Sequence, residues 1–473
     1  MPGPDKRNLV KLTSRVVRSG LAATLALSLN APALHAQESQ PRNGPSLIRD
    51  SEIEAILRAD AAPIFRAAGL QSDNVHIYLV NDRELNAFVA GGQNLFLNTG
   101  LIMKTKTPNE LMGVIAHETG HIADGHLARN DEGSRAAMAT QLVTMGLGMV
   151  AAFAGGDPGA AAALVYSAEE FGALQYFTFT RVQEASADQA GARFLETAGL
   201  SGKGLVDFFN NFKYEEVFAN AKRDKFFQSH PLTAVRIDAL KSRVEAAPHY
   251  GVVDTPEAIA QHAIMIAKLK AFINYPVETY RDYPETDTSF PARYARAIAH
   301  YKDLEPDKAV ELLDALAVDY PTDPYIFEFK GQVLFEAGRS VEAEPALRKA
   351  VQLAPDQSLL RMALGQTLLA NGNKAEGNIK EAITNLQRTV ALEHDNALAW
   401  KLMAEAYERD GNPAMARLAS AEEKFVEGQM GDARSFGYRA RELLAEGTPE
   451  YRRASDIINA AEVTALQRRG RGG

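Results

Sequence analysis

The sequence predicts a mainly α protein, built from an α+β domain with a small β-sheet and a following α-solenoid. Two observations predict this architecture. Strand-like segments and then apolar residues at helical spacing occupy the first half of the chain, and a 34-residue repeat occupies the second half. The 473 residues are enough for two or three domains.

The best-marked helix of the first half begins at Thr107. Thr107 and Glu110 have the spacing of a capping box, and Pro108 stands at the first helical position, which needs no backbone N–H. Apolar residues then recur at helical spacing, so one face of this helix should be buried. These residues are Leu111, Val114, Ile115 and Ile122.

This helix carries the pattern H-E-x-x-H at His117, Glu118 and His121. Residues four apart lie one above the other on a helix, so both histidines can direct a ring nitrogen at one metal ion. Glu118 can reach a water beside that ion and take its proton. The pattern therefore predicts one catalytic Zn²⁺ ion per chain, with Glu118 as the general base.

A catalytic zinc site usually has three protein ligands, so the chain must supply a third. His126 is a poor candidate, because it lies five residues beyond His121 and about 140° away around a helix. The metzincin pattern also fails, since Asp124 and Leu127 stand where it requires glycine and histidine. We interpret His126 as a polar residue near a helix end.

Glu184 is the better candidate. It lies one turn before Asp188 on a second predicted helix, which continues to Leu195. Glu184 can supply the third ligand, and Asp188 can accept a hydrogen bond from the other nitrogen of a ligand histidine and so fix its tautomer. Small residues at 185–187 favour a close helix–helix approach, but a solvated acidic face fits the same spacing. The spacing alone leaves both interpretations open.

Together these motifs resemble the zinc metallopeptidases of the HtpX and CAAX-prenyl-protease type. Residues 86–88 (Asn-Ala-Phe), with glycines at 91, 92 and 100, and residues 229–231 (Ser-His-Pro), followed by Arg236, fit the same family. The similarity spans roughly residues 50–240. It implies a gluzincin-like α+β fold, Glu184 as a zinc ligand and Asp188 as the partner of a ligand histidine.

Two residues of the last motif have open roles. His230 precedes a proline, so it should lie on an extended or turn segment. It can act in catalysis by donating to the oxyanion, approach the zinc as a removable extra ligand, or be a polar residue at a helix entry. Arg236 can orient the substrate or its oxyanion, or pair with an acidic residue.

The first 36 residues have the features of a secretory signal peptide. Basic residues come first, an apolar run extends from Leu21 to Leu34, and small residues precede the predicted cleavage site before Gln37. Cleavage removes five basic residues and one acidic residue and changes the formal net charge from −9 to −13, which argues against nucleic-acid binding. The chain has no cysteine, so a thiolate metal site is excluded. We expect a periplasmic protein.

One uncharged segment, residues 136–156, is long enough to span a membrane. Polar residues such as Gln141 make it weakly hydrophobic, and a second apolar stretch ends at Phe179. We therefore expect a helical hairpin over residues 136–180 that packs beside the active-site cleft and can touch a membrane surface. A true membrane span is the alternative.

The second half of the chain repeats every 34 residues. Pro321 and Pro355 are one period apart, as are Gly331 and Gly365. This is the period of tetratricopeptide repeats, in which each unit is a pair of antiparallel helices. After an insertion of five residues near 377–380, we count about four repeats and a less regular helical cap. Such a stack forms a curved surface that binds protein segments.

These patterns divide the chain into six segments. They are a signal peptide (1–36), a linker (37–49), the zinc metallopeptidase domain (50–250), connecting helices (251–289), the repeats (290–460) and a disordered tail (461–473). Within the peptidase domain, residues 95–97 are expected to form an edge strand that pairs with an extended substrate and places a peptide bond over the metal.

The order of signal peptide, zinc peptidase and repeats resembles that of periplasmic quality-control proteases. The resemblance implies a zinc-dependent endopeptidase that degrades misassembled outer-membrane proteins and assists the assembly of correct ones. The repeats would contact these clients or the outer-membrane assembly machinery. Two other functions stay open: a chaperone or scaffold with a structural zinc site, and an integral membrane zinc protease.

Overall fold

The computed structural model describes residues 46–125, 181–212, 230, 232–372 and 377–470. The predicted signal peptide, His126 and the predicted hairpin at 136–180 lie outside these ranges. The described chain is mainly helical and contains one small sheet, which confirms the predicted fold class. Among the described helices, none combines the length and the apolar character that a membrane span requires.

The sheet has four strands in the order β1-β2-β4-β3. The strands are β1 (Ser46–Ile48), β2 (His76–Asn81), β3 (Ala87–Ala90) and β4 (Asn94–Asn98). The inner pair, β2 and β4, is parallel, and each outer strand is antiparallel to its neighbour. The segment expected to be a linker (37–49) therefore contains β1, which pairs with β2.

The prediction that residues 95–97 form an edge strand is wrong. They belong to β4, which is paired on both sides. The ring of Phe96 stacks on Tyr78 of β2 at a centroid distance of 5.0 Å and on Phe88 of β3 at 4.8 Å. The edges of the sheet are β1 and β3. Strand β4 pairs in parallel with β2, although β3 lies between them in the sequence. The alternation of apolar residues along each strand does not predict this strand order.

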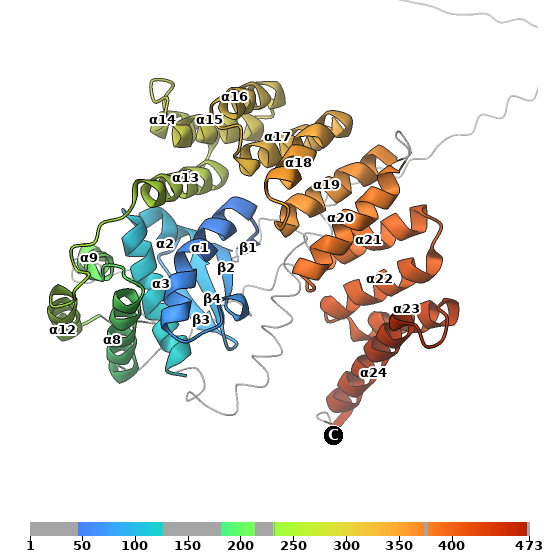
Figure 1. The fold of residues 1–473 in the computed structure, drawn as a ribbon, viewed down its shortest axis with the longest axis horizontal. Helices are drawn as coiled ribbons and strands as arrows, with labels where there is room; N and C mark the ends of the chain where they lie inside the picture. The colour runs from blue at the N-terminus through green and yellow to red at the C-terminus, as the bar shows by residue number, and fades with distance from the viewer. Residues whose placement is uncertain (1–45, 126–180, 213–229, 231, 373–376, 471–473) are drawn as a thin grey trace, which may run out of the picture. The chain divides into compact units, whose positions relative to one another are not determined.

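One face of the sheet is covered by helices α1 (Ser51–Ala67) and α3 (Pro108–Ala123), as Figure 1 shows. Alternate strand residues such as Leu79, Leu95 and Leu97 point into the core that these helices complete. At its start, Thr107 caps α3 by accepting a hydrogen bond from the Glu110 backbone N–H at 3.1 Å. The Glu110 carboxylate accepts from the backbone N–H of Lys106, one residue earlier than in a capping box.

Further helices complete the peptidase region and lead to the repeats. They are α2 (Thr99–Lys104), α8 (Arg181–Thr197), α9 (Lys203–Phe212), α12 (Ala234–Glu245), α13 (Pro256–Ile273) and α14 (Pro276–Asp282). Helices α3, α8, α9 and α12 pack on one another, and α13 packs on both α1 and the first repeat helix.

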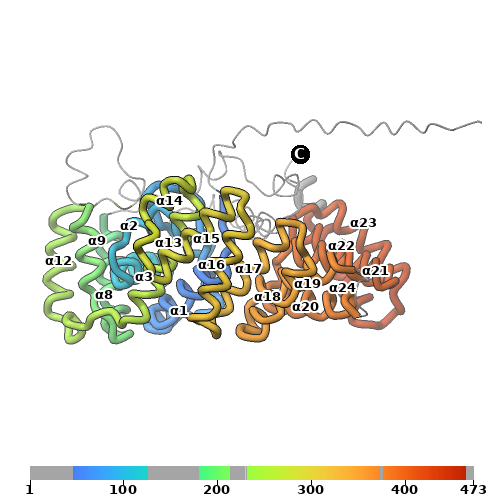
Figure 2. Tube along the Cα trace, turned by 90° about the horizontal axis from the view of Figure 1, so that it is seen from above, coloured from blue at the N-terminus to red at the C-terminus, as the bar shows by residue number. Residues whose placement is uncertain are grey.

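The repeats are antiparallel helix pairs that follow one another in chain order (Figure 2). The pairs are α15 (Phe290–Lys302) with α16 (Pro306–Asp319), α17 (Pro324–Glu336) with α18 (Ser340–Leu353), α19 (Ser358–Asn371) with α20 (Asn378–Leu392), and α21 (Ala397–Arg409) with α22 (Pro413–Val426). The first helix of each pair begins 34, 34 and then 39 residues after the previous one, which matches the predicted period and insertion.

Two more helices, α23 (Met430–Leu443) and α24 (Pro449–Gly470), end the described chain. Residues 461–470 were predicted to be a disordered tail, and this prediction is wrong because α24 continues through them. The buried side chain of Ala461 and its neighbours Ile457 and Ile458 hold this helix against the array.

Candidate metal centre

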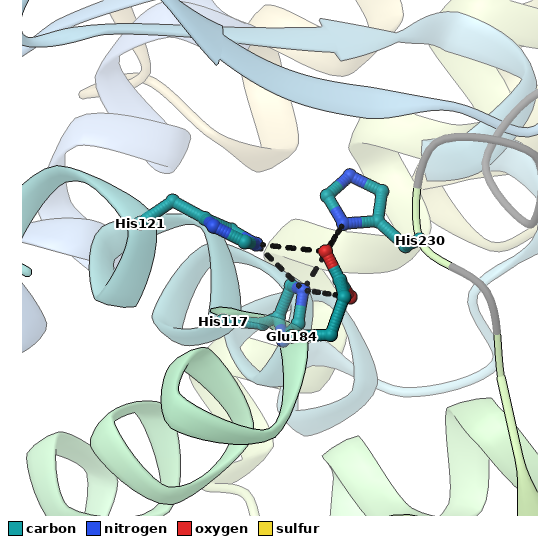
Figure 3. A group of neighbouring side chains, drawn as sticks. All are labelled: His117, His121, Glu184 and His230. Carbon is teal, nitrogen blue, oxygen red and sulfur yellow. Dashed lines mark hydrogen bonds and ion pairs between the residues drawn. The ribbon is translucent and has the colours of Figure 1, made fainter. Parts of the chain in front are cut away.

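Four potential metal ligands from three separate segments meet in the peptidase domain (Figure 3). His117 and His121 come from α3, Glu184 comes from the first turn of α8, and His230 precedes α12. All four side chains are buried, and their ligand atoms lie within 4.8 Å of one another. The structure thus brings together the four sequence-predicted candidates for metal binding.

The distances within this group fit a tetrahedral zinc site. Nε2 of His117 lies 3.3 Å from Nε2 of His121, and the Glu184 carboxylate oxygens lie 3.5 and 3.3 Å from these two nitrogens. A tetrahedron with metal–ligand bonds of about 2.0–2.1 Å has edges of about 3.3–3.4 Å. Each histidine nitrogen therefore stands near the required separation from the other nitrogen and from one of the two Glu184 oxygens.

Close packing of two helices sets this separation. A Cβ at Gly120 of α3 would lie 2.8 Å from the backbone oxygen of Ala187, and a Cβ at Gly191 of α8 would lie 3.0 Å from the backbone of Ala116. Only glycine at both positions lets α8 approach α3 this closely. As a result, Glu184 reaches the two histidines.

Asp188 and Arg236 form a second layer behind the ligands. Oδ1 of Asp188 lies 3.0 Å from Nδ1 of His117, the nitrogen that faces away from the ligand group. The Arg236 guanidinium donates to both oxygens of Asp188 at 2.8 and 2.9 Å, and its third nitrogen lies 3.0 Å from Oε2 of Glu184. Arg236 thus pairs with two acidic residues, which was one of the two roles expected for it.

Glu118 lies beside the group but is not part of it. Its carboxylate is buried, and Oε1 lies 3.4 Å from Nε2 of His230. Neither carboxylate oxygen has a hydrogen-bond partner within the described ranges. Burial raises the pKa of this carboxyl group. Two free acceptor atoms and a raised pKa are the properties that a general base needs.

The electrostatic field of the site favours a cation at His117. Burial alone would lower the pKa of this histidine, but hydrogen bonds to Asp188 and Glu184 raise it to about 10. Burial likewise opposes ionisation of Asp188, yet its hydrogen bonds to His117 and Arg236 lower its pKa. A site that holds a proton this tightly also favours a divalent cation in its place, because the same carboxylates stabilise either charge.

Phe209 is a site residue that motif analysis missed. Its ring meets the His117 imidazole edge to face at 5.9 Å, and the Arg236 guanidinium lies 5.9 Å above it. Phe209 belongs to α9, whose apolar residues recur at helical spacing. That pattern predicts a buried face but does not indicate that the face adjoins a metal site.

Comparison with known proteins identifies this part of the chain. Residues 48–244 match the family model described as peptidase family M48, and residues 294–358 match that of the tetratricopeptide repeat. The chain carries a peptidase family M48 domain followed by tetratricopeptide repeats. It is a metalloprotease, as the sequence predicted.

Named relatives extend over both parts of this chain. It is 25% identical over 372 residues to the beta-barrel assembly-enhancing protease of Yersinia pestis, covering 76% of this chain and 73% of that protein. The protein of the same name from Escherichia coli K12 is 23% identical, covering 83% of this chain and 80% of that protein. The metalloprotease LoiP of Escherichia coli K12 is 32% identical over 181 residues, 37% of this chain and 64% of LoiP.

Proposed function

We propose that this chain is a zinc-dependent endopeptidase that acts on outer-membrane proteins in the periplasm. The observation that carries the chemistry is the buried set of His117, His121 and Glu184, with the free carboxylate of Glu118 beside it. The beta-barrel assembly-enhancing proteases, which resemble most of the chain, support the choice of client.

In this proposal the three ligands hold one Zn²⁺ ion, which supplies a Lewis acid for the scissile carbonyl and lowers the pKa of water. Glu118 accepts the proton of the attacking water and passes it to the leaving amine. Asp188 keeps the His117 ring in the tautomer that directs Nε2 at the ligand group. Arg236 holds both Asp188 and the second oxygen of Glu184, so it positions the ligands and does not bind the oxyanion.

His230 takes the role of a removable extra ligand. Its Nδ1 lies 2.9 Å from Oε1 of Glu184, a hydrogen-bond distance, and 3.3 Å from Nε2 of His117, the separation expected of two ligands of one zinc ion. It would therefore occupy the fourth ligand position, which a catalytic site needs for water or substrate. His230 would have to leave this position before cleavage. While it stays there, it would keep the peptidase inactive until a substrate binds.

The substrate is expected to pair with β3. This strand is the sheet edge that packs beside α3, the helix that carries His117 and Glu118. An extended peptide that adds to an edge strand is held by main-chain hydrogen bonds, so many sequences fit. This suits a protease that removes misassembled proteins of different sequence.

The test is cleavage of casein by the mature protein, compared with Glu118→Gln and with chelator-treated protein. We expect both treatments to abolish cleavage and added zinc to restore it only in the chelated wild type. A matched control is Glu196→Gln, a half-exposed glutamate on α8 that pairs with Arg243 on the surface. Equal cleavage by the wild type, Glu118→Gln and the chelator-treated protein would contradict the metalloprotease mechanism.

The two rival functions predict different outcomes. A chaperone with a structural zinc site keeps its whole function in the Glu118→Gln variant. An integral membrane protease resists carbonate extraction from membranes, whereas we expect the mature chain to be released.

A further inference from the structure

Helix α9 is attached to the beginning of α3. The Asn109 side chain of α3 accepts a hydrogen bond from the backbone N–H of Gly204 at 2.7 Å and donates to the backbone oxygen of Ser201 at 2.9 Å. A Cβ at Gly204 would lie 2.3 Å from the Asn109 backbone, and a Cβ at Gly113 would lie 2.7 Å from Cα of Leu205. The two helices therefore touch backbone to backbone where α9 starts.

The other end of α9 is held by Glu110. Asn211 of α9 donates to Oε1 of this buried carboxylate at 3.0 Å, and Lys106 donates to the side-chain oxygen of Asn211 at 2.7 Å. The Lys104 ammonium group lies 5.7 Å from the centre of the Phe212 ring. Contacts at both ends thus fix the rotation of α9 about its axis, and with it the direction of the side chains between them.

Phe209 is the α9 residue that this arrangement directs at the metal centre. Its side chain is buried, and the planes of its ring and of the His117 imidazole are 85° apart at a centroid distance of 5.9 Å. The Arg236 guanidinium lies over the face of the same ring, 5.9 Å from its centre. Phe209 therefore contacts one candidate ligand and the arginine that pairs with another, Glu184.

The Phe209 ring borders a layer of hydrogen bonds between charged groups. Oδ1 of Asp188 lies 3.0 Å from Nδ1 of His117, and Arg236 donates to the two Asp188 oxygens at 2.8 and 2.9 Å. Such hydrogen bonds are stronger where water is excluded, because the local dielectric constant is low. An apolar ring packed against both His117 and Arg236 keeps water from this layer, and it has no polar atom that could compete for their hydrogen bonds.

We propose that Phe209 is a positioning residue of the metal centre and acts through the hydrogen bond between Asp188 and His117. Its ring holds the imidazole in the orientation that directs Nε2 at the ligand group, and it keeps water away from Asp188. Without the ring, His117 and Arg236 can turn and water can compete for the carboxylate. The inference rests on the proposed zinc site and adds to it a residue from a fourth segment of the chain.

The test measures the zinc affinity of the mature, metal-free protein by competition with a chromophoric chelator. We expect Phe209→Leu to lower this affinity about tenfold, as the loss of a group behind a metal ligand does. Phe65→Leu is the matched control, because it removes the same atoms from an equally buried ring in the same core. Phe65 lies on α1, which supplies none of the four candidate ligands, so its variant should bind zinc like the wild type.

A double-mutant cycle determines whether Phe209 acts through Asp188. Residues that act through one interaction have non-additive effects, so Phe209→Leu should lower the zinc affinity of Asp188→Asn by less than about threefold. Co²⁺ bound in place of zinc gives a second readout, since its visible absorption depends on the ligand geometry. We expect Phe209→Leu to change this spectrum and Phe65→Leu to leave it like that of the wild type.

The outcomes separate this inference from the proposed function. Equal zinc affinity of Phe209→Leu and the wild type would overturn the inference and leave the zinc site intact, as would an equally large loss in the Asp188→Asn background. The same loss in Phe65→Leu would also overturn it, because Phe209 would then act only through the stability of the core. A wild type that binds no zinc would contradict both the inference and the proposed function.

Discussion

At the scale of single residues, Asp188 is the proposed partner of a metal-ligand histidine. Its carboxylate lies 3.0 Å from Nδ1 of His117 and is itself fixed by Arg236. Replacing it by asparagine keeps the shape but removes the charge that orients and polarises the ligand. Loss of such a partner typically costs about 10–100-fold in metal affinity.

We therefore expect Asp188→Asn to lower zinc affinity about 10–100-fold, measured by competition with a chromophoric chelator. Asp207→Asn is the matched control, because Asp207 pairs only with Lys203 on the surface of α9 among the described residues. Unchanged zinc affinity in Asp188→Asn would contradict the role assigned to this residue.

His230 distinguishes two mechanisms by the sign of one effect. If it is a removable ligand at the fourth corner, His230→Ala opens that corner and raises kcat/KM for casein, about tenfold for each 1.4 kcal/mol of competition removed. If it stabilises the oxyanion, the same variant lowers kcat. The 2.9 Å distance between its Nδ1 and Glu184 leads us to expect the increase.

Motif spacing predicted some of the site residues and not others. His117, Glu118 and His121 could be predicted because five consecutive residues on one helix fix their relative positions. The role of Asp188 followed from the family resemblance, because its one-turn spacing from Glu184 fits a solvated acidic face equally well. Which of its two expected roles Arg236 has could not be predicted, because the answer depends on how the separate helices α8 and α12 meet.

At the scale of elements, the approach of α8 to α3 places the third ligand. A Cβ at Gly120 would lie 2.8 Å from the Ala187 oxygen, and neither backbone can give way without moving Glu184 from the histidines.

We expect Gly120→Ala to weaken zinc binding and to destabilise the peptidase domain by about 1–3 kcal/mol, the usual cost of overpacking. Zinc titration and thermal unfolding measure the two effects. The control is Gly431→Ala on α23, where an added Cβ meets open space. If Gly120→Ala binds zinc like the wild type, helix spacing does not set the ligand geometry.

Elements were predicted well where their signals are local. The start of α3 and the 34-residue period of the repeats are both written in short segments, and both are present. Sheet order was not predicted, because the parallel pairing of β2 with β4 depends on packing against α1 and α3. Helix α24 was not predicted beyond residue 460, where Ala461 is buried but Val463 is exposed and no apolar stripe marks the helix.

At the scale of the whole molecule, the peptidase domain and the repeats are joined by buried charge. The period and the H-E-x-x-H motif predicted each part separately, but no local pattern links Ser51 to Glu328 or Arg49 to Glu393. This junction depends on residues that lie hundreds of positions apart, so it follows only from the folded chain. The titration of carboxyl groups at this junction offers a way to measure its contribution to stability.

Two carboxyl groups at this junction have a raised pKa. Burial raises the pKa of Glu52 and that of Glu328 to about 7 each, although Lys268 partly opposes this. Between about pH 4.5 and 7 the folded protein therefore holds protons that the unfolded chain has released. Stability from these groups is present at low pH, is lost as the pH rises through this window, and is constant above it.

We expect Glu328→Gln to remove part of this pH dependence, because the amide cannot ionise. Between pH 5.5 and 8, the variant should lose less stability than the wild type, by an amount on the order of 1 kcal/mol. Thermal unfolding at both pH values measures the difference, and comparing two proteins under the same conditions cancels the titration of groups that do not interact with Glu328. Glu381→Gln, on the surface of the repeats, should behave like the wild type. An identical slope in Glu328→Gln and wild type would show that this carboxyl group does not titrate at the junction.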